Sequence, residues 1–297
     1  MLFSLKSILE LSKSKPSRKL VVVAAEDISV LMAVKKATFE GIIQPILIGK
    51  LNEILSLAKS IDFNITSIET IDIPDNTLAS KTAVSLIQKG KADILMKGIL
   101  STAVLLKTVV NKESGLTQGN LLSHFAITEL PAYHKLLALT DVAMNIKPDF
   151  IEKIDILKNA IKVMYALGYT MPKVAVISPL ETINPKIESS IHAAMLTMMN
   201  RRNQIMDCLI DGPLALDNAI NKEAAHHKGI SSDVAGDADL LLLPDLDTGN
   251  VLYKSLNFLA KATTAAIITG AKVPIVLTSR ADSELSKLYS IALSVSV

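Results

Sequence analysis

Short runs of apolar, often β-branched residues recur along the chain with the length of buried strands. Ten runs predict strands, at 19–24, 44–48, 66–72, 93–96, 136–140, 173–177, 207–210, 239–243, 264–269 and 274–278. Helical spacing between most of them predicts helices at 28–40, 50–60, 76–89, 101–112, 149–167, 186–202, 249–261 and 283–295. Apolar strands that alternate with helices are typical of mostly parallel sheets covered on both faces. The pattern therefore predicts an α/β protein.

The number of strands also bears on domain organisation. Ten strands are more than one sheet usually holds, which favours two lobes. The expected break lies near 128–148, where Pro131 and Pro148 interrupt the chain. The segments 121–127 and 136–140 in this region are expected to form an antiparallel pair.

Composition narrows the classes of function. The chain has 297 residues, of which 49% are hydrophobic and 20% charged, so a sizeable core is expected. The net charge is only +2, tryptophan is absent, and aromatic residues make up 4%. Neither phosphate neutralisation on a large scale nor base stacking is supported, so no nucleic-acid partner is expected. A single cysteine excludes an intrachain disulfide framework and fits a reducing, cytoplasmic compartment.

A mean hydropathy of +0.39 raises the question of a membrane segment. No run of 18 apolar residues occurs, and the apolar runs have the length of strands. Lys6 and Glu10 interrupt the first eleven residues, which predicts an amphipathic helix and no signal peptide. We therefore expect no membrane association.

Arginine is scarce, because the 31 basic residues include only Arg18, Arg201, Arg202 and Arg280. Arg280 follows a predicted strand and precedes the last predicted helix, with Ser279 and Asp282 beside it. The guanidinium, the hydroxyl and the helix N–H groups together could hold a phosphate. The alternative is an ordinary helix cap, provided by Ser279 or Asp282, with a solvated arginine.

Two further turns follow predicted strands, where ligands bind in parallel α/β folds. In the turn 243–250, Gly249 would let a ligand approach the backbone and Thr248 could cap the next helix. Asp245 is not accompanied by histidine or glutamate at ligand spacing, so no metal site is expected. In the turn 96–102, Lys97 stands beside a glycine and two hydroxyls, a combination that suits an anion. For the turn 243–250, a plain connecting loop remains the alternative.

Other residues with chemical potential have simpler interpretations. Cys208 lies in an apolar run and is interpreted as a core residue. His226 and His227 are expected in a polar loop, and His192 on a helix as a structural or surface histidine. His124 precedes the expected break between lobes and is retained as a candidate. Dinucleotide, P-loop and serine-hydrolase signatures are absent.

Several blocks together resemble the phosphate acetyl/butyryl-transferase family. They are Asp211 to Asp217, Val234 to Gly236 with Ala238 and Asp239, Pro244 to Asn250 with Lys254, and Ser279 with Arg280. The resemblance spans nearly the whole chain, and its most specific parts are the block from Pro244 to Asn250 and the pair Ser279 and Arg280. Leu121 to His124 and Thr140 to Asn145 look more like the butyryl branch than the acetyl branch.

The resemblance implies a two-lobed fold like that of isocitrate and isopropylmalate dehydrogenases, with mostly parallel sheets and an interlobe cleft. Residues 1–135 and 270–297 would form the first lobe. Residues 136–269 would form the second lobe, which would carry a homodimer interface. The implied reaction moves a short-chain acyl group, butyryl or similar, reversibly between coenzyme A and inorganic phosphate. Acyl-CoA and phosphate would be substrates, and no tightly bound cofactor or metal is implied.

The resemblance also implies roles for particular residues. Ser279 and Arg280 would hold the phosphate, and Asp282 is the nearest candidate for a catalytic base, because Ser286 stands where the family has a more distal aspartate. The expected substrate-binding residues are Lys97, Ser101, Thr102, Ser123, His124, Asp245, Thr248, Gly249 and Asn250. Transfer would be direct, without a covalent acyl-enzyme. Two alternatives remain: a metal- and NAD(P)-dependent decarboxylating dehydrogenase of the same fold, and a non-catalytic protein that binds CoA or acyl phosphate.

Overall fold

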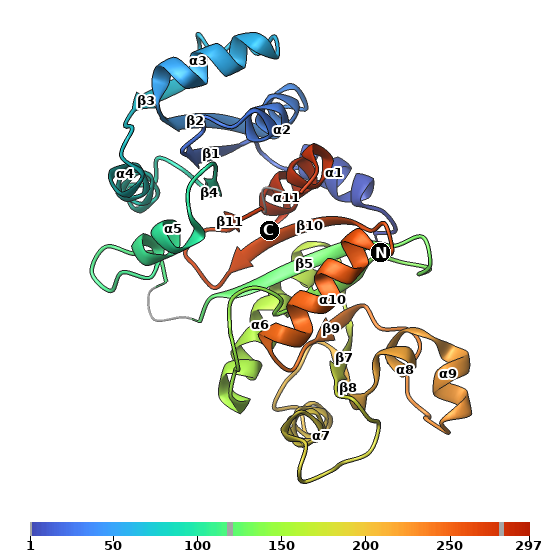
Figure 1. Ribbon diagram of the computed structural model, residues 1–297. Coiled ribbons are helices and arrows are strands. Elements are labelled where there is room, and N and C mark those ends of the chain that lie inside the picture. Colours follow the sequence, from blue (N-terminus) through green and yellow to red (C-terminus); the bar gives the residue numbers. More distant parts are fainter. Residues whose placement is uncertain (1, 118–120, 279–281) are drawn as a thin grey trace. The chain divides into compact units, whose positions relative to one another are not determined.

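The computed structural model describes residues 2–117, 121–278 and 282–297 (Figure 1). The chain divides into two compact units. Unit 1 comprises Met1–Leu5 and Ser123–Thr264, and unit 2 comprises Lys6–Leu122 and Ala265–Val297. The last segment of the chain therefore folds together with the first third.

Unit 2 is built on a mostly parallel sheet. Its strands are β1 (Arg18–Val23), β2 (Ile43–Gly49), β3 (Glu69–Asp72), β4 (Ile94–Lys97), most of β10 (Thr263–Thr269), and β11 (Ile275–Val276). They lie in the order β3-β2-β1-β4-β11-β10, and only β10 runs antiparallel to its neighbour β11. The last four residues of β1, Leu20 to Val23, are fully buried, as both-face coverage requires.

Helices cover this sheet on two sides. They are α1 (Leu5–Lys13), α2 (Ile28–Phe39), α3 (Leu51–Ser60), α4 (Asn76–Gln88), α5 (Thr102–Val109) and α11 (Glu284–Ser296). Helix α11 packs against α2, and α4 packs against α5; Figure 1 shows these two pairs on opposite sides of β1 and β4. Asp27 and Asp75 accept the N–H groups of Val30 and Leu78, so a carboxylate caps the start of α2 and of α4.

Unit 1 contains a second group of strands, β5 (Ser123–Glu129), β6 (Leu137–Thr140), β7 (Lys173–Ile177), β8 (Leu209–Leu214) and β9 (Leu240–Leu242). Their order is β5-β6-β9-β7-β8. Strands β5 and β6 are antiparallel, which confirms the pair expected around Pro131, and the other pairs are parallel. The helices of this unit are α6 (Phe150–Ala166), α7 (Glu188–Arg201), α8 (Leu216–Ile220), α9 (Lys222–His227) and α10 (Leu246–Phe258).

The predicted α/β class and the mostly parallel strands are thus confirmed, and each of the ten predicted strands has a counterpart. Three local expectations are wrong. Cys208 lies just before β8, not within a strand, although it is only 2% exposed. His226 and His227 end α9 and do not lie in a loop. The helix expected from 249 begins at Leu246.

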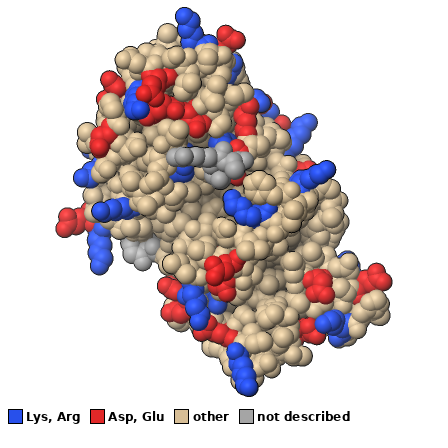
Figure 2. All heavy atoms as spheres, viewed as in Figure 1, with Lys and Arg blue, Asp and Glu red and all other residues tan. Residues whose placement is uncertain are grey.

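The face of the molecule drawn in Figure 2 does not carry a strong charge of one sign. On the face drawn in Figure 2, basic and acidic side chains are interspersed among uncharged ones. This distribution agrees with the small net charge of +2. No helix among the described residues is long and apolar enough to cross a membrane.

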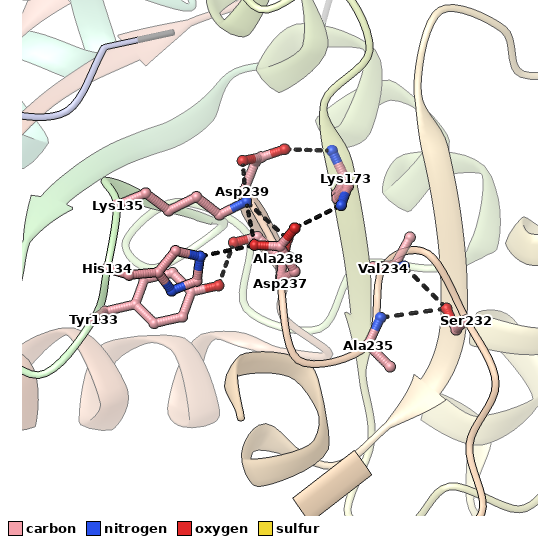
Figure 3. Close-up of polar contacts among 10 residues, drawn as sticks. All are labelled: Tyr133, His134, Lys135, Lys173, Ser232, Val234, Ala235, Asp237, Ala238 and Asp239. Atoms are coloured by element: carbon pink, nitrogen blue, oxygen red, sulfur yellow. Dashed lines mark hydrogen bonds and ion pairs between the residues drawn. The ribbon is translucent and has the colours of Figure 1, made fainter. Parts of the chain in front are cut away.

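A network of charged side chains, buried at Lys135 and Asp239, joins the amino ends of β6, β7 and β9 (Figure 3). Lys135 contacts Asp239 at 2.6 Å and Asp237 at 3.0 Å, and Lys173 contacts Asp237 at 2.5 Å. His134 Nε2 lies 2.8 Å from the same Asp237 carboxylate. Burial would raise the pKa of Asp237, but hydrogen bonds from Lys173, Lys135 and His134 lower it well below its usual range. We call these five residues the charge network.

The loop before β9 is also fixed by polar contacts. Tyr133 donates its hydroxyl hydrogen to the Ala238 carbonyl at 2.7 Å, and Ser232 Oγ accepts the N–H groups of Val234 and Ala235 (Figure 3). The block from Val234 to Asp239, one of those that carry the family resemblance, is therefore held in place at the amino ends of the strands. Its contacts indicate a structural role.

Candidate active site

A pocket of about 580 Å³ opens at the carboxyl ends of β7 and β9 in unit 1. Ser178 follows β7, Asp245 follows β9, and Ser189 and Thr248 lie in the first turns of α7 and α10; all four line the pocket. The carboxyl edge of parallel strands is where open α/β sheets bind ligands. The structure thus places two of the expected substrate-binding residues, Asp245 and Thr248, in one pocket.

The first turn of α10 is shaped by Asp245. Its Oδ1 accepts the N–H of Thr248 at 2.8 Å, so Asp245 caps the helix and Thr248, which was expected to be the cap, is the donor. A carboxylate is favoured at this place because it also faces the positive end of the helix dipole. The helix starts three residues earlier than predicted for this reason.

Gly249 and Asn250 hold α10 against the turn that follows β6. A Cβ atom on Gly249 would lie 2.4 Å from the Asp141 carbonyl oxygen and 3.0 Å from Val142 Cα. Asn250 Nδ2 donates to the Val142 carbonyl at 3.4 Å. Gly249 therefore permits a close approach of another backbone segment. The sequence suggested that a ligand would approach here, but in the structure the neighbour is the protein's own chain.

The turn that Gly249 contacts is organised by Asp141, a buried residue that was not among the candidate site residues. Its carboxylate accepts the N–H groups of Ala143 and Met144 at 2.9 and 3.0 Å and the side-chain amide of Asn145 at 2.6 Å. The sequence signal was present, since Thr140 to Asn145 is one of the blocks that resemble the family. Asp141 is 4% exposed, so these hydrogen bonds satisfy a buried carboxylate.

Ser123 and His124 lie at the start of β5, buried in unit 1. Ser123 Oγ accepts a hydrogen bond from Asn159 Nδ2 of α6 at 3.0 Å. The His124 ring meets Tyr253 of α10 edge to face, with centroids 6.0 Å apart. These contacts connect β5 to α6 and α10, and neither Asn159 nor Tyr253 was recognised from the sequence as part of this region.

Lys97, Ser101 and Thr102 belong to unit 2, at the carboxyl end of β4. Lys97 is 6% exposed, and its Nζ donates to the carbonyls of Gly98 and Leu100 at 3.1 and 3.3 Å. Ser101 caps α5 by accepting the N–H of Val104, and Thr102, the first residue of that helix, is exposed. The Lys97 side chain therefore folds back over the turn that connects β4 to α5. This places its positive charge beside the start of α5, where an anion could bind.

Gly98 explains the tight geometry of this turn. A Cβ atom there would lie 1.9 Å from the Ala24 carbonyl oxygen, which belongs to the segment that follows β1. Gly98 N–H in turn donates to the Val23 carbonyl at 2.8 Å. Glycine is required so that the ends of β1 and β4 can approach, and Lys97 is positioned as a result.

The third group of candidates precedes α11 in the sequence. Ser279 and Arg280 lie outside the described residues. Ser283 caps α11 by accepting the N–H of Ser286, which corrects the expectation that Ser279 or Asp282 serves as the cap. The Asp282 carbonyl accepts a hydrogen bond from Lys287 Nζ at 2.5 Å.

Lys153 and His192, which lie in the region of the unit 1 pocket, could not be recognised as a pair from the sequence. Lys153 of α6 lines the pocket and is 4% exposed, and its Nζ lies 3.0 Å from His192 Nδ1 of α7. Burial lowers the pKa of Lys153, and burial together with the Lys153 charge lowers the pKa of His192. A lysine within an otherwise amphipathic helix pattern carries no signal of burial, so only the folded chain brings the two side chains together.

The described residues contain no cluster of three or more histidine, cysteine or acidic side chains that could hold a metal ion. Burial, with a smaller contribution from Asp207, raises the pKa of the Cys208 thiol to about 12. At neutral pH this group is a protonated thiol, which is a poor nucleophile. The candidate residues therefore supply cations, hydroxyls and helix starts, which is a chemistry suited to binding acyl and phosphoryl oxygens.

Comparison with known proteins points to one class, the acyltransferases that use phosphate. Residues 76–295 match the family model described as phosphate acetyl/butaryl transferase. The chain is 46% identical to the phosphate butyryltransferase of Clostridium acetobutylicum, over 99% of this chain and 98% of that one. It is 42% identical to the phosphate acetyltransferase of Thermotoga maritima, over 98% of each chain.

A solved structure agrees with these relatives. The crystal structure of a branched-chain phosphotransacylase from Enterococcus faecalis V583 is 38% identical, with a TM-score of 0.84 over 94% of this chain and 98% of that one. The chain belongs to the phosphate acetyl/butyryl-transferase family, and the family predicted from its sequence is confirmed. It is an enzyme whose reaction is the reversible transfer of an acyl group between coenzyme A and phosphate.

Proposed function

We propose that this enzyme acts on short-chain acyl groups and favours butyryl-CoA over acetyl-CoA. The observation that carries the proposal is the 46% identity to a phosphate butyryltransferase along almost the entire chain. The apolar residues around Ser123 and His124, Leu122 and Phe125, are buried beside these two candidates and are consistent with a longer acyl chain. Identity to a phosphate acetyltransferase is nearly as high, so the preference must be measured.

The test is a thiol-release assay with acetyl-, propionyl-, butyryl- and isobutyryl-CoA, with and without inorganic phosphate. Release should depend on phosphate and be faster with butyryl-CoA than with acetyl-CoA. Each buried methylene contributes about 0.8 kcal/mol, so two methylenes give about a tenfold preference in kcat/KM. A clear preference for acetyl-CoA would refute the butyryl assignment and leave the reaction class intact.

We further propose that transfer is direct. Phosphate or the CoA thiolate attacks the acyl carbonyl carbon, and the other group leaves, without an acyl-enzyme. Supporting this, the chain's single cysteine, Cys208, is buried and held as a thiol. Arg280 and Ser279 are proposed to hold the phosphate oxygens, and Lys97 to add positive charge. A guanidinium with a hydroxyl beside it suits developing negative charge in the transition state.

Substitution of Arg280 tests the phosphate site. Arg280→Lys retains the charge but loses the two-pronged grip on phosphate, and should lower kcat/KM by roughly a hundredfold or more. Arg201→Lys, at the end of α7, is the matched control and should retain activity. Near-normal kinetics of Arg280→Lys in a folded protein would show that phosphate is bound by other residues.

Asp282 is proposed as the base that accepts the thiol proton when CoA attacks an acyl phosphate. Because Ser283 caps α11, capping does not account for Asp282. If Asp282 is the base, the loss of activity in Asp282→Asn should shrink as the pH rises and the thiol, with a pKa near 8.5, ionises unaided. A loss that does not change with pH would argue against this role, and unchanged activity would exclude it.

The remaining expectations are also proposals. The enzyme would work in the cytoplasm as a homodimer of two-lobed chains, with 136–269 contributing the interface and 1–135 with 270–297 forming the first lobe. Light scattering coupled to gel filtration tests the dimer. The alternative functions make different predictions: a dehydrogenase of this fold would reduce NAD(P), and a non-catalytic sensor would bind CoA without releasing thiol from acyl-CoA.

A further inference from the structure

The unit 1 pocket contains a buried cation to which none of the described residues supplies a counter-ion. Lys153 is 4% exposed and lines the pocket of about 580 Å³. Within the described chain, its Nζ has one hydrogen-bond partner, His192 Nδ1 at 3.0 Å, and no carboxylate within 4.0 Å. An ammonium group has three donors, and burying such a charge without a partner is costly. Two of the three N–H donors of the Lys153 ammonium are therefore available to a ligand in the pocket.

The other charged groups that line the pocket are already engaged. Lys147 forms an ion pair with Glu188 at 3.3 Å. Asp245 caps α10 through the N–H of Thr248 at 2.8 Å. The carboxylates of Glu188, Asp245 and Asp149 favour the charged form of Lys153 from a distance. Burial outweighs them and lowers the pKa of Lys153. The local balance leaves Lys153 as the uncompensated positive charge.

A helix start adds donors to the same pocket. Helix α7 begins at Glu188, and its N-cap residue, Ile187, has no side chain that can accept a hydrogen bond. Glu188 and Ser189, in the first turn of α7, both line the pocket, and Ser189 Oγ lies 3.1 Å from Ser178 Oγ. An uncapped helix start offers N–H groups and the positive end of the helix dipole to an anion.

The remaining wall of the pocket is apolar, with Ile177, Pro179, Ala215 and Leu216 among its residues. The volume lies within the range of small-molecule sites. The pocket thus combines room for an apolar part of a ligand with one buried cation and one uncapped helix start.

We propose that this pocket binds the oxyanion of a small molecule, a phosphate or a carboxylate group, through Lys153 Nζ and the first turn of α7. His192 accepts a hydrogen bond from the ammonium at Nδ1, which orients Lys153 and requires the neutral ring with its proton on Nε2. The pocket also contains Asp245 and Thr248, two of the expected substrate-binding residues, and the inference does not depend on which acyl group the enzyme prefers.

The test is calorimetric titration of the full-length protein with three probes: inorganic phosphate, butyrate and coenzyme A. Lys153→Met removes the charge and keeps the length of the side chain. It should weaken the binding of at least one probe by tenfold to a hundredfold, the range for hydrogen bonds to charged groups. Lys158→Met on the same helix is the control, because Lys158 is exposed and forms an exposed ion pair with Asp155. This control should bind every probe like the wild type.

The three probes identify the source of the oxyanion. Dependence of phosphate or CoA binding on Lys153 indicates a phosphate group, and dependence of butyrate binding indicates a carboxylate; either outcome supports the site. The ligand-free Lys153→Met protein should melt at the same temperature as the wild type or higher, because it no longer buries an uncompensated charge. A purely structural lysine would instead destabilise the protein when removed.

A second measurement needs no substitution at Lys153. Labelling the histidines with ¹³C at Cε1 gives five signals, and the one that disappears in His192→Gln reports on His192. The probe that binds should shift this signal in the wild-type protein. The proposal is overturned if none of the three probes binds, if Lys153→Met and Lys158→Met bind all of them alike, or if binding leaves the His192 signal unchanged.

Discussion

Removing Lys135 from the charge network should destabilise the enzyme far more than removing an ordinary surface lysine. Lys135 contacts Asp239 at 2.6 Å, and the two side chains are only 5% and 2% exposed. Its Nζ also donates to the Asp237 carbonyl at 2.8 Å. Lys135→Met leaves the Asp239 carboxylate buried without its cation. Breaking a buried pair in this way costs about 3–5 kcal/mol of unfolding free energy, whereas an exposed pair contributes about 0–1 kcal/mol.

The measurement is urea unfolding followed by circular dichroism at one fixed protein concentration. Lys50→Met is the control, because Lys50 and its partner Glu53 are 49% and 54% exposed and their loss should change stability little. The double variant Lys135→Met/Asp239→Asn should regain much of the loss, because it no longer buries an unpaired charge. Asn can still accept the N–H of Lys173, which Asp239 accepts at 2.8 Å.

Two results would refute this reasoning. One is a loss in Lys135→Met no larger than that in Lys50→Met, which would mean that water reaches the network. The other is a double variant no more stable than the single one, which would mean that lost packing, and not the unpaired carboxylate, accounts for the cost.

The structure makes three further predictions. The lowered pKa of Asp237 contributes stability that is present above the pKa of the unfolded state, near 3.9, and is lost as the pH falls toward the pKa of the folded state. When the free energy of unfolding is measured as a function of pH in the acid range, it should therefore fall less steeply in Asp237→Asn than in the wild type. Cys208→Ala should retain most thiol-release activity, since burial raises the pKa of this thiol to about 12, and a trapped acyl adduct on Cys208 would contradict direct transfer. Gly249→Ala should cost about 1–3 kcal/mol in a denaturant titration because its Cβ would lie 2.4 Å from the Asp141 carbonyl oxygen, whereas Thr248→Ala keeps the capped N–H and should be nearly neutral; equal stabilities would show that the turn yields easily.

Much of the architecture could be predicted from local pattern alone. Runs such as Leu20 to Val23 are apolar on successive residues, and only a strand covered on both faces buries all of them. The helix that begins at Ile28 could be found because its apolar spacing follows an aspartate that caps it. Family membership also followed from the sequence, since ordered motif blocks such as Pro244 to Asn250 are a linear property of the chain.

The candidate site was predicted less completely, because the role of each side chain depends on partners distant in sequence. Asp245 and Thr248 were singled out, yet which of the two caps α10 was decided by the backbone geometry of the turn. Gly249 was expected to allow a ligand to approach the backbone. In the structure it instead allows the close approach of the turn at Asp141, which lies 108 residues earlier in the chain. Close approaches of this kind leave no trace in local spacing.

The buried charges show most plainly the difference between what can be predicted from the sequence and what depends on the tertiary structure. Composition fixes how many lysines and acids the chain has, and periodicity favours their exposure. Only the folded chain brings Lys135 to Asp239, across 104 positions, and Lys153 to His192, across 39. A lysine becomes buried because its neighbours in space satisfy or require its charge, and the tertiary structure alone determines which neighbours those are.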